Sequence, residues 1–284
     1  MTVLGIDVSK WQDENSTPQM MDFHKAVDAG AKFVFIKVSQ ATYLDPDYVL
    51  NWTHAKDAGL PVGGYHYLDW TKPAVDQARF FAGVLSADPG QLPPVVDFEC
   101  KTNAPNKRDA TERLYQFCVT VEQMLGRKIM IYTGAFYWAA FYSGAHEDYF
   151  ASRYLWIASY SDLNYMLRNL ATYTIWDDYT FWQFTDKGNG LRFGAESLQL
   201  DMNYFNGTPE RFAQFVGGVV IPVTWKLRVT SLIGLRVRSG PGTSFERVDG
   251  LPYRAVVTVD KQKGNWARLA DGRGWICTDW TVRV

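Results

Sequence analysis

The sequence predicts a mixed α/β protein, namely a (β/α)-barrel of the TIM type that is irregular in its last third, followed by a small all-β barrel. Strand-like and helix-like segments alternate over the first 205 residues, which is typical of a sheet built on parallel strands. Beyond residue 216 the pattern changes to short strands separated by turn residues. A length of 284 residues has room for one large or two ordinary domains.

The elements of the first region follow from hydrophobic periodicity. Apolar spacing predicts helices over 20–31, 46–58, 74–86 and 108–125, the last of which carries one apolar stripe and ends at Gly126. Short β-rich runs predict eight strands, over 3–9, 33–40, 61–68, 94–99, 128–133, 154–160, 181–186 and 197–205. We expect the helices to thin out after residue 150. Eight strands with intervening helices favour a closed barrel.

The second region reads as a separate small barrel. Gly217, Gly218 and Pro222 mark a linker, so the expected domains are 1–215 and 225–284, joined by 216–224. Five short strands are predicted in the second domain, over 226–229, 234–238, 255–261, 266–269 and 274–277. Exposed tryptophans in so small a domain favour binding over catalysis.

Charge divides the chain at the same place. Residues 1–216 hold 18 basic and 25 acidic residues, a net charge of −7, whereas the rest hold 11 and 5, a net charge of +6. This asymmetry suggests two domains with different partners. The basic residues are dispersed among strands, so we expect no nucleic-acid partner.

Several classes of protein are not expected. No run of apolar residues is long enough to span a membrane, and the N-terminus shows no signal peptide. The cysteines are few and far apart, which predicts free thiols at Cys100, Cys118 and Cys277. The histidines lack metal-ligand spacing, so neither a metal nor another cofactor is expected.

The segment Pro93–Glu99 holds the strongest sign of chemistry. It reads as a buried strand on which Asp97 and Glu99 share one face, because side chains on a strand alternate. Two neighbouring acids do not both ionise easily, so one pKa should be raised and leave a proton donor near neutral pH. Such pairs are typical of enzymes that cleave glycosidic bonds.

Strand order adds two more acids to this pair. Catalytic groups of such barrels lie at the carboxyl ends of the strands. Asp7 lies near the end of the first strand and Asp201 lies within the last, and these strands are neighbours if the barrel closes. We therefore expect Asp7, Asp97, Glu99 and Asp201 to face one cavity.

Aromatic residues and one lysine accompany the same strand ends. Rings at a barrel mouth can stack on sugar faces, although packing in the core is the alternative for each. Lys37 stands in an apolar strand, and we expect it to face a carboxylate and hold it ionised. The candidate substrate-binding residues are Tyr65, Tyr67, Lys37, Tyr132, Trp156 and Trp182.

Residues 3–206 resemble the muramidases of glycoside hydrolase family 25. The matching motifs occur in family order and are Gly5-Ile6-Asp7-Val8-Ser9, Phe33-Val34-Phe35-Ile36-Lys37, Gly64-Tyr65-His66-Tyr67, Val95-Val96-Asp97-Phe98-Glu99, Ile131-Tyr132-Thr133, Leu155-Trp156-Ile157-Ala158, Trp182-Gln183-Phe184 and Leu200-Asp201-Met202-Asn203. Residues 226–284 resemble a bacterial SH3 domain through Gly234–Gly242 and Gly274-Trp275-Ile276. The combination resembles a bacteriophage endolysin.

The resemblance implies a lysozyme that cleaves the β-1,4 bond after N-acetylmuramic acid in peptidoglycan. Glu99 would be the general acid and then the base that activates water. Sequence leaves open whether Asp97 or Asp7 is a nucleophile; we favour assistance by the 2-acetamido group of the substrate, oriented by Asp97, with retention of configuration. Asp7 and Asp201 would tune the pair and hold the sugar.

The resemblance also implies a setting. The SH3-like domain would bind the cell wall, and the protein would remain as a monomer in the host cytoplasm until a holin releases it. Two alternatives stay open, a chitinase-like glycosidase and a non-catalytic protein that binds the cell wall. The fuller acidic array of chitinases is missing before Asp97, where Leu92, Pro93, Pro94, Val95 and Val96 stand.

Overall fold

The chain forms two compact units in a computed structural model that describes residues 3–13, 20–217 and 225–283. The first unit is Met1–Gly218 and the second is Val219–Val284. The larger part of the expected linker 216–224 lies outside the described residues, whereas Val216 is buried in the core of the first unit. None of the helices in the described ranges is long and apolar enough to cross a membrane.

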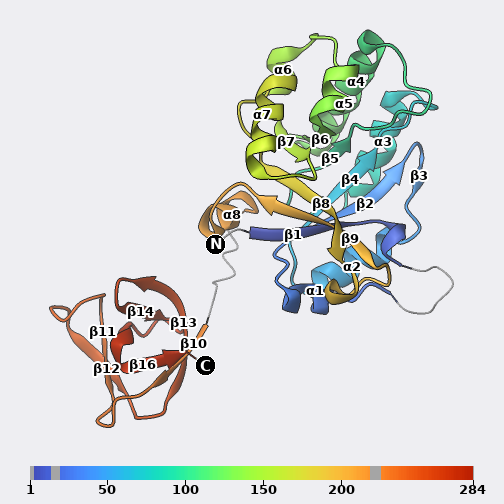
Figure 1. Ribbon diagram of the computed structural model, residues 1–284. Helices are drawn as coiled ribbons and strands as arrows, with labels where there is room; N and C mark the ends of the chain where they lie inside the picture. Colours follow the sequence, from blue (N-terminus) through green and yellow to red (C-terminus); the bar gives the residue numbers. More distant parts are fainter. Residues whose placement is uncertain (1–2, 14–19, 218–224, 284) are drawn as a thin grey trace. The chain divides into compact units, whose positions relative to one another are not determined.

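The first unit is a closed barrel, as predicted (Figure 1). Eight strands of the described residues form the ring in the order β1-β9-β8-β7-β6-β5-β4-β2, and pairing of β1 with β2 closes it. A ninth strand, β3, forms a short hairpin with β2. The strands are β1 (Val3–Val8), β2 (Val34–Gln40), β3 (Tyr43–Leu44), β4 (Val62–Tyr67), β5 (Val95–Asp97), β6 (Met130–Gly134), β7 (Tyr154–Ala158), β8 (Phe181–Asn189) and β9 (Gln199–Phe205).

The direction of the closing strand differs from the prediction of a parallel barrel. Within the ring, which does not include β3, neighbouring strands from β1 through β8 run parallel, but β9 is antiparallel to both β8 and β1. The reason is the connection, because only a short turn with one 3-10 helix, Leu191–Phe193, separates β8 from β9. So short a link makes a hairpin, whereas a parallel crossover needs a dozen residues or more.

Helices cover the outside of the ring of strands, apart from α8 (Pro209–Phe215), which buries Phe212 against the aromatic side chains inside the ring. The others are α1 (Phe23–Ala29), α2 (Tyr48–Asp57), α3 (Ala74–Leu85), α4 (Lys107–Leu125), α5 (Ala135–Phe141), α6 (Glu147–Ala151) and α7 (Leu163–Tyr173). The expected loss of helices after residue 150 is only partly right, because α7 and α8 lie there. Asp162 caps α7 by accepting from the Tyr165 N–H, and the helix buries Met166 and Leu170 on one face.

Two apolar layers hold the barrel together. Phe33, Phe35, Trp156 and Phe181 fill the inside of the ring, where Phe35 stacks on Trp156 with ring centroids 4.4 Å apart. The larger cluster lies outside the ring, between the strands and the helices. Burial of these large rings on both sides of the sheet fixes the strand ends that carry the acids.

The second unit is an all-β barrel of seven strands among its described residues. They are β10 (Trp225–Val229), β11 (Leu235–Arg238), β12 (Arg247–Leu251), β13 (Val256–Lys263), β14 (Trp266–Leu269), β15 (Trp275–Cys277) and β16 (Thr281–Arg283). The sequence predicted five of these; β12 and β16 were missed because each is short and mostly exposed, so neither has a clear alternating pattern.

Candidate active site

Three of the four predicted acids lie on strands at one end of the barrel. Asp7 on β1 and Asp201 on β9 are directly paired in the sheet register, so the predicted neighbourhood of the first and last strands is confirmed. Asp97 is the last residue of β5. Because β9 is antiparallel, its first half reaches the same end of the barrel as the carboxyl ends of the parallel strands.

The fourth acid, Glu99, lies just beyond its strand. The strand ends at Asp97 instead of continuing to residue 99, while Phe98 turns into the outer core against Trp70 and Tyr137. Asp97 is 5% exposed and Glu99 is exposed. The two acids therefore have different surroundings, which is the condition for giving them different roles.

Asp97 carries an unused acceptor. Its Oδ1 is buried and has no hydrogen-bond partner in the structure. A buried polar atom without a partner is costly, so its presence points to a function.

Asp7 is held by two amide side chains that the sequence analysis did not select. Gln183 Nε2 and Asn203 Nδ2 both donate to Asp7 Oδ2, at 2.9 and 2.8 Å. On its other side, Gln183 Oε1 accepts from the hydroxyls of Tyr132 and Tyr160, at 2.8 and 2.9 Å. A polar residue buried inside an otherwise aromatic strand was the available sign for Gln183.

The acids keep protons to unusually high pH. Burial raises the pKa of Asp7 to about 6, although the hydrogen bonds from Asn203 and Gln183 act to lower it. Burial and the charge of Asp7 together raise the pKa of Asp201 to about 8. Burial raises the pKa of Asp97 well above its ordinary range, and the charge of Glu99 adds to this. Glu99 is exposed, yet the walls around it exclude enough water to raise its pKa, with a contribution from Asp201.

A cleft extends from Glu99 over the ends of β6 and β7. A hollow of about 220 Å³ holds the Glu99 side chain and is also lined by Lys101, Tyr132, Gly134, Tyr137, Ala158, Ser159 and Tyr160. A second hollow of about 230 Å³ shares five of these residues and continues toward α5 and α7. The exposed ring of Tyr160 is 53% accessible and lies in both. The acids thus lie beside an open, partly aromatic cleft.

Tyr65, Tyr67 and Lys37 reach the acid cluster from β4 and β2. Tyr65 and Tyr67 are partly exposed. Burial raises the pKa of each hydroxyl, and smaller contributions come from Asp7 and then Asp97 at Tyr65 and from Cys100 and then Asp97 at Tyr67. Lys37 Nζ donates to Gln40 Oε1 at 3.0 Å and lies 5.1 Å from the Tyr67 ring centre. Lys37 lowers the pKa of Asp97, although burial outweighs this effect. That Lys37 holds a carboxylate ionised stays a prediction.

Two predicted sugar-binding tryptophans are instead core residues. Trp156 is 1% exposed inside the barrel, where its Nε1 donates to Asn203 Oδ1 at 2.8 Å. Trp182 is 8% exposed in the outer core, and its Nε1 donates to the Ser159 carbonyl at 2.8 Å. Neither tryptophan is among the residues that line the two hollows of the cleft. Tyr132 is also buried but borders the cleft beside Glu99.

A (β/α)-barrel with four carboxylates gathered beside such a cleft has the architecture of a glycoside hydrolase. The chain belongs to glycosyl hydrolases family 25, whose family model matches residues 6–191, and a model of the bacterial SH3 domain matches residues 233–281. The predicted resemblance is confirmed on both counts. The protein is a lysozyme-type hydrolase that acts on peptidoglycan of the cell wall.

Similar proteins agree with this assignment. The uncharacterized protein YegX of Escherichia coli K12 is 32% identical over 77% of this chain and 75% of its own length. Lysozyme M1 of Streptomyces globisporus is 28% identical over 74% of this chain and 69% of its own. The solved muramidase of Acremonium alcalophilum is 28% identical, with a TM-score of 0.61 over 76% of this chain and 99% of its own.

Proposed function

We propose that the chain is an N-acetylmuramidase that hydrolyses the β-1,4 bond between N-acetylmuramic acid and N-acetylglucosamine. The observation that carries the proposal is the pair formed by exposed Glu99 and buried Asp97, whose Oδ1 has no partner. One acid can reach a glycosidic oxygen in the cleft, and the other can accept a hydrogen bond from a group of the bound sugar.

Glu99 is the general acid of the proposed reaction. It gives its proton to the glycosidic oxygen while the C1–O bond breaks and the electron pair moves to that oxygen. The carbonyl oxygen of the substrate's own 2-acetamido group attacks C1 from the other face and forms a cyclic intermediate. Ionised Glu99 then takes a proton from water, the hydroxide attacks C1, and the ring opens with net retention.

Asp97 orients that acetamido group. In the free protein burial raises the pKa of Asp97 well above its usual range, which favours the protonated form. The acetamido N–H of a bound sugar would supply the donor that Oδ1 lacks, which favours the ionised form and leaves the proton of the pair on Glu99.

Asp7 is less suited to direct attack on C1. Its Oδ2 already accepts from Gln183 and Asn203, and these bonds lower its nucleophilicity and fix its position. Asp7 and Asp201 are therefore proposed to set the electrostatic potential around Asp97 and Glu99. Tyr65, Tyr67 and Tyr132 are proposed to line the sugar site.

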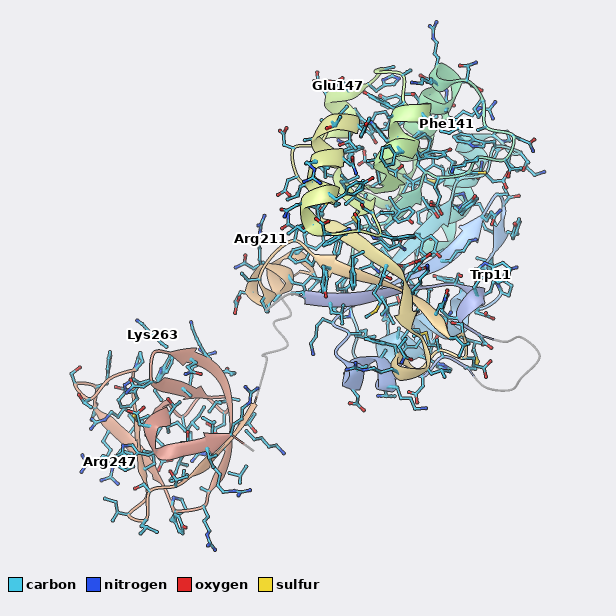
Figure 2. All side chains as sticks on the ribbon, in the orientation of Figure 1. Trp11, Phe141, Glu147, Arg211, Arg247 and Lys263 are labelled. Atoms are coloured by element: carbon cyan, nitrogen blue, oxygen red, sulfur yellow. The ribbon has the colours of Figure 1, made fainter. Side chains whose placement is uncertain are left out.

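The test is cleavage of purified Gram-positive walls, followed by turbidity and by new reducing ends. Glu99→Gln should fold and lose at least about 100-fold in rate, because a general acid contributes about that much. Glu147→Gln, at the exposed first turn of α6 (Figure 2), is the matched control and should retain full rate. Substantial lysis by Glu99→Gln, or release of free amines without reducing ends, rejects the proposal.

The same assay separates the alternatives. A chitinase-like enzyme would cleave N-acetylglucosamine oligomers as fast as peptidoglycan, and a non-catalytic wall binder would yield no reducing ends. We further propose that the protein acts as a monomeric endolysin, held in the host cytoplasm until a holin admits it to the wall, and that residues 225–284 bind the wall.

A further inference from the structure

One row of side chains crosses five strands of the second unit. Sheet register pairs Arg247 with Arg238, Arg238 with Trp275, Trp275 with Arg268, and Arg268 with Lys261. We call these five residues the basic row. Directly paired residues of antiparallel strands point to the same face of the sheet, so four cations and one indole share one surface.

The basic row faces outward. The residues next to it along the strands, Val237, Ile276, Ala267 and Leu269, are buried in the core of the unit. Arg247, Arg268 and Lys261 are exposed, and Arg238 and Trp275 are partly exposed. Figure 2 shows Arg247 on the outside of this unit.

Arg268 is paired with Asp260 by two hydrogen bonds, whereas the other three cations of the row, Arg238, Arg247 and Lys261, form no ion pair among the described residues. Residues 225–284 hold five acidic and eleven basic residues. Three of the acids form ion pairs with only two of the basic residues: Asp260 with Arg268, and Asp249 and Asp271 with Arg273. Arg238 uses its Nη1 on the Phe245 carbonyl at 2.7 Å, and it lies directly opposite Arg247. Like charges directly opposite each other destabilise a sheet, so this pair suits an anion that binds between them.

We infer that the basic row binds a linear anionic polymer of the cell wall, one whose phosphodiester groups repeat along its length. This inference rests on the proposed function for its choice of wall polymer. Guanidinium groups match phosphate oxygens in geometry as well as charge. Strands lie about 4.8 Å apart, so the five-strand row extends over roughly 19 Å of surface, enough for several phosphates of one chain.

The composition of the row argues against nucleic acid as its partner. Single-stranded nucleic acids are bound by successive aromatic platforms that stack bases. The row has a single ring, Trp275, at its middle. A polymer of polyol phosphate needs only charge along its backbone and one apolar contact, which is what the row supplies.

The experiment measures wall binding of the full chain carrying Glu99→Gln, so that digestion does not remove the target. Walls are used intact or after hydrofluoric acid has removed phosphodiester polymers, and bound protein is quantified by sedimentation at several salt concentrations. Binding to intact walls should be about tenfold tighter than to stripped walls and weaken with salt.

Two double variants localise the effect. Arg238→Ala with Arg247→Ala should lower binding to intact walls about tenfold and leave binding to stripped walls unchanged. Lys226→Ala with Arg228→Ala, which removes two exposed charges of β10 outside the row, should change it less than twofold. All four side chains are at least partly exposed, and circular dichroism verifies that each variant is folded.

Three results overturn the inference. These are equal binding to intact and stripped walls, equal losses in the two double variants, and stronger competition by single-stranded DNA than by purified wall polymer. The proposed function is judged separately, by reducing ends that the wild-type chain releases from stripped walls. Reducing ends without preferential binding reject only the inference; preferential binding without reducing ends rejects only the proposed function.

Discussion

Gln183 on β8 hydrogen-bonds to Asp7 on β1, two strands away in the ring, with Nε2 donating to Oδ2 at 2.9 Å. The bond determines which way the amide faces, because an ionised carboxylate only accepts. The Gln183 Oε1 is thereby aimed at the hydroxyls of Tyr132 and Tyr160, which border the cleft. One amide thus joins the acid on β1 to two phenols on β6 and after β7.

Removing this amide should impair the enzyme through Asp7. Gln183→Leu deletes a donor to the ionised form, so the pKa of Asp7 should rise above its value of about 6. We expect the acidic limb of the pH–rate profile to move upward and the rate at pH 6 to fall by about 10- to 100-fold. Gln214→Leu, an exposed position on α8, is the control. A profile that coincides with the wild type would contradict the role given to Gln183.

Asp201 should make the fold less stable as pH rises. Its pKa is about 8 in the folded chain against 3.8 normally, so the folded state holds the extra proton between these values. The stability it lends is present below pH 3.8 and is lost as pH rises toward 8.

Asp201→Asn should therefore raise the free energy of unfolding at pH 9 by about 2 kcal/mol, a figure reduced for partial exposure, and leave it unchanged at pH 3. Urea unfolding followed by tryptophan fluorescence measures both. Asp148→Asn, exposed on α6, should have no effect at either pH. A gain for Asp201→Asn at pH 3 as large as at pH 9 would show that the charge is not the cause.

Asp97→Asn tests the acetamido route. The variant keeps a buried polar group but cannot ionise, so we expect the rate on N-acetylated walls to fall about 100-fold. On walls whose sugars carry a free amine, the wild type should already be this slow and the variant should lose little more. Fast turnover of the free-amine walls by the wild type would instead favour a carboxylate nucleophile.

Trp156→Phe distinguishes packing from sugar binding. The change removes the donor to Asn203 and part of the stack on Phe35, so the free energy of unfolding should fall by about 2 kcal/mol. KM should stay within twofold of the wild type. A raised KM with unchanged stability would restore Trp156 to the sugar site.

The sequence predicted the barrel and the four acids because both depend on local patterns. Strand periodicity located every strand of the ring, and the closed order of strands made Asp7 and Asp201 neighbours. The direction of β9 was not predictable from periodicity, since a strand pattern is the same in both senses. Gln183 and Asn203 were missed because their role depends on contacts with Asp7, which is 176 and 196 residues away in the chain.

Burial decided the remaining errors. Trp156 lies in the middle of β7 and Trp182 near the start of β8, whereas Tyr67 ends β4, but alternation alone does not say which of these aromatic rings reaches water. The tryptophans fill the core on both sides of the sheet, whereas the tyrosines keep part of their surface exposed. The tryptophans are buried because their large side chains fill the core and because each indole N–H finds a hydrogen-bond acceptor inside the fold.

The reversed direction of β9 also decides where the polypeptide leaves the ring. Asp201 is near the beginning of β9 and Phe205 ends it opposite Val3, the first residue of β1 in the register. The exit therefore lies at the end of the barrel away from the acids, on the same side as the start of β1. Whatever is joined after α8, whether a wall-binding unit or a different module, can be exchanged or lengthened without threading a connection past the cleft.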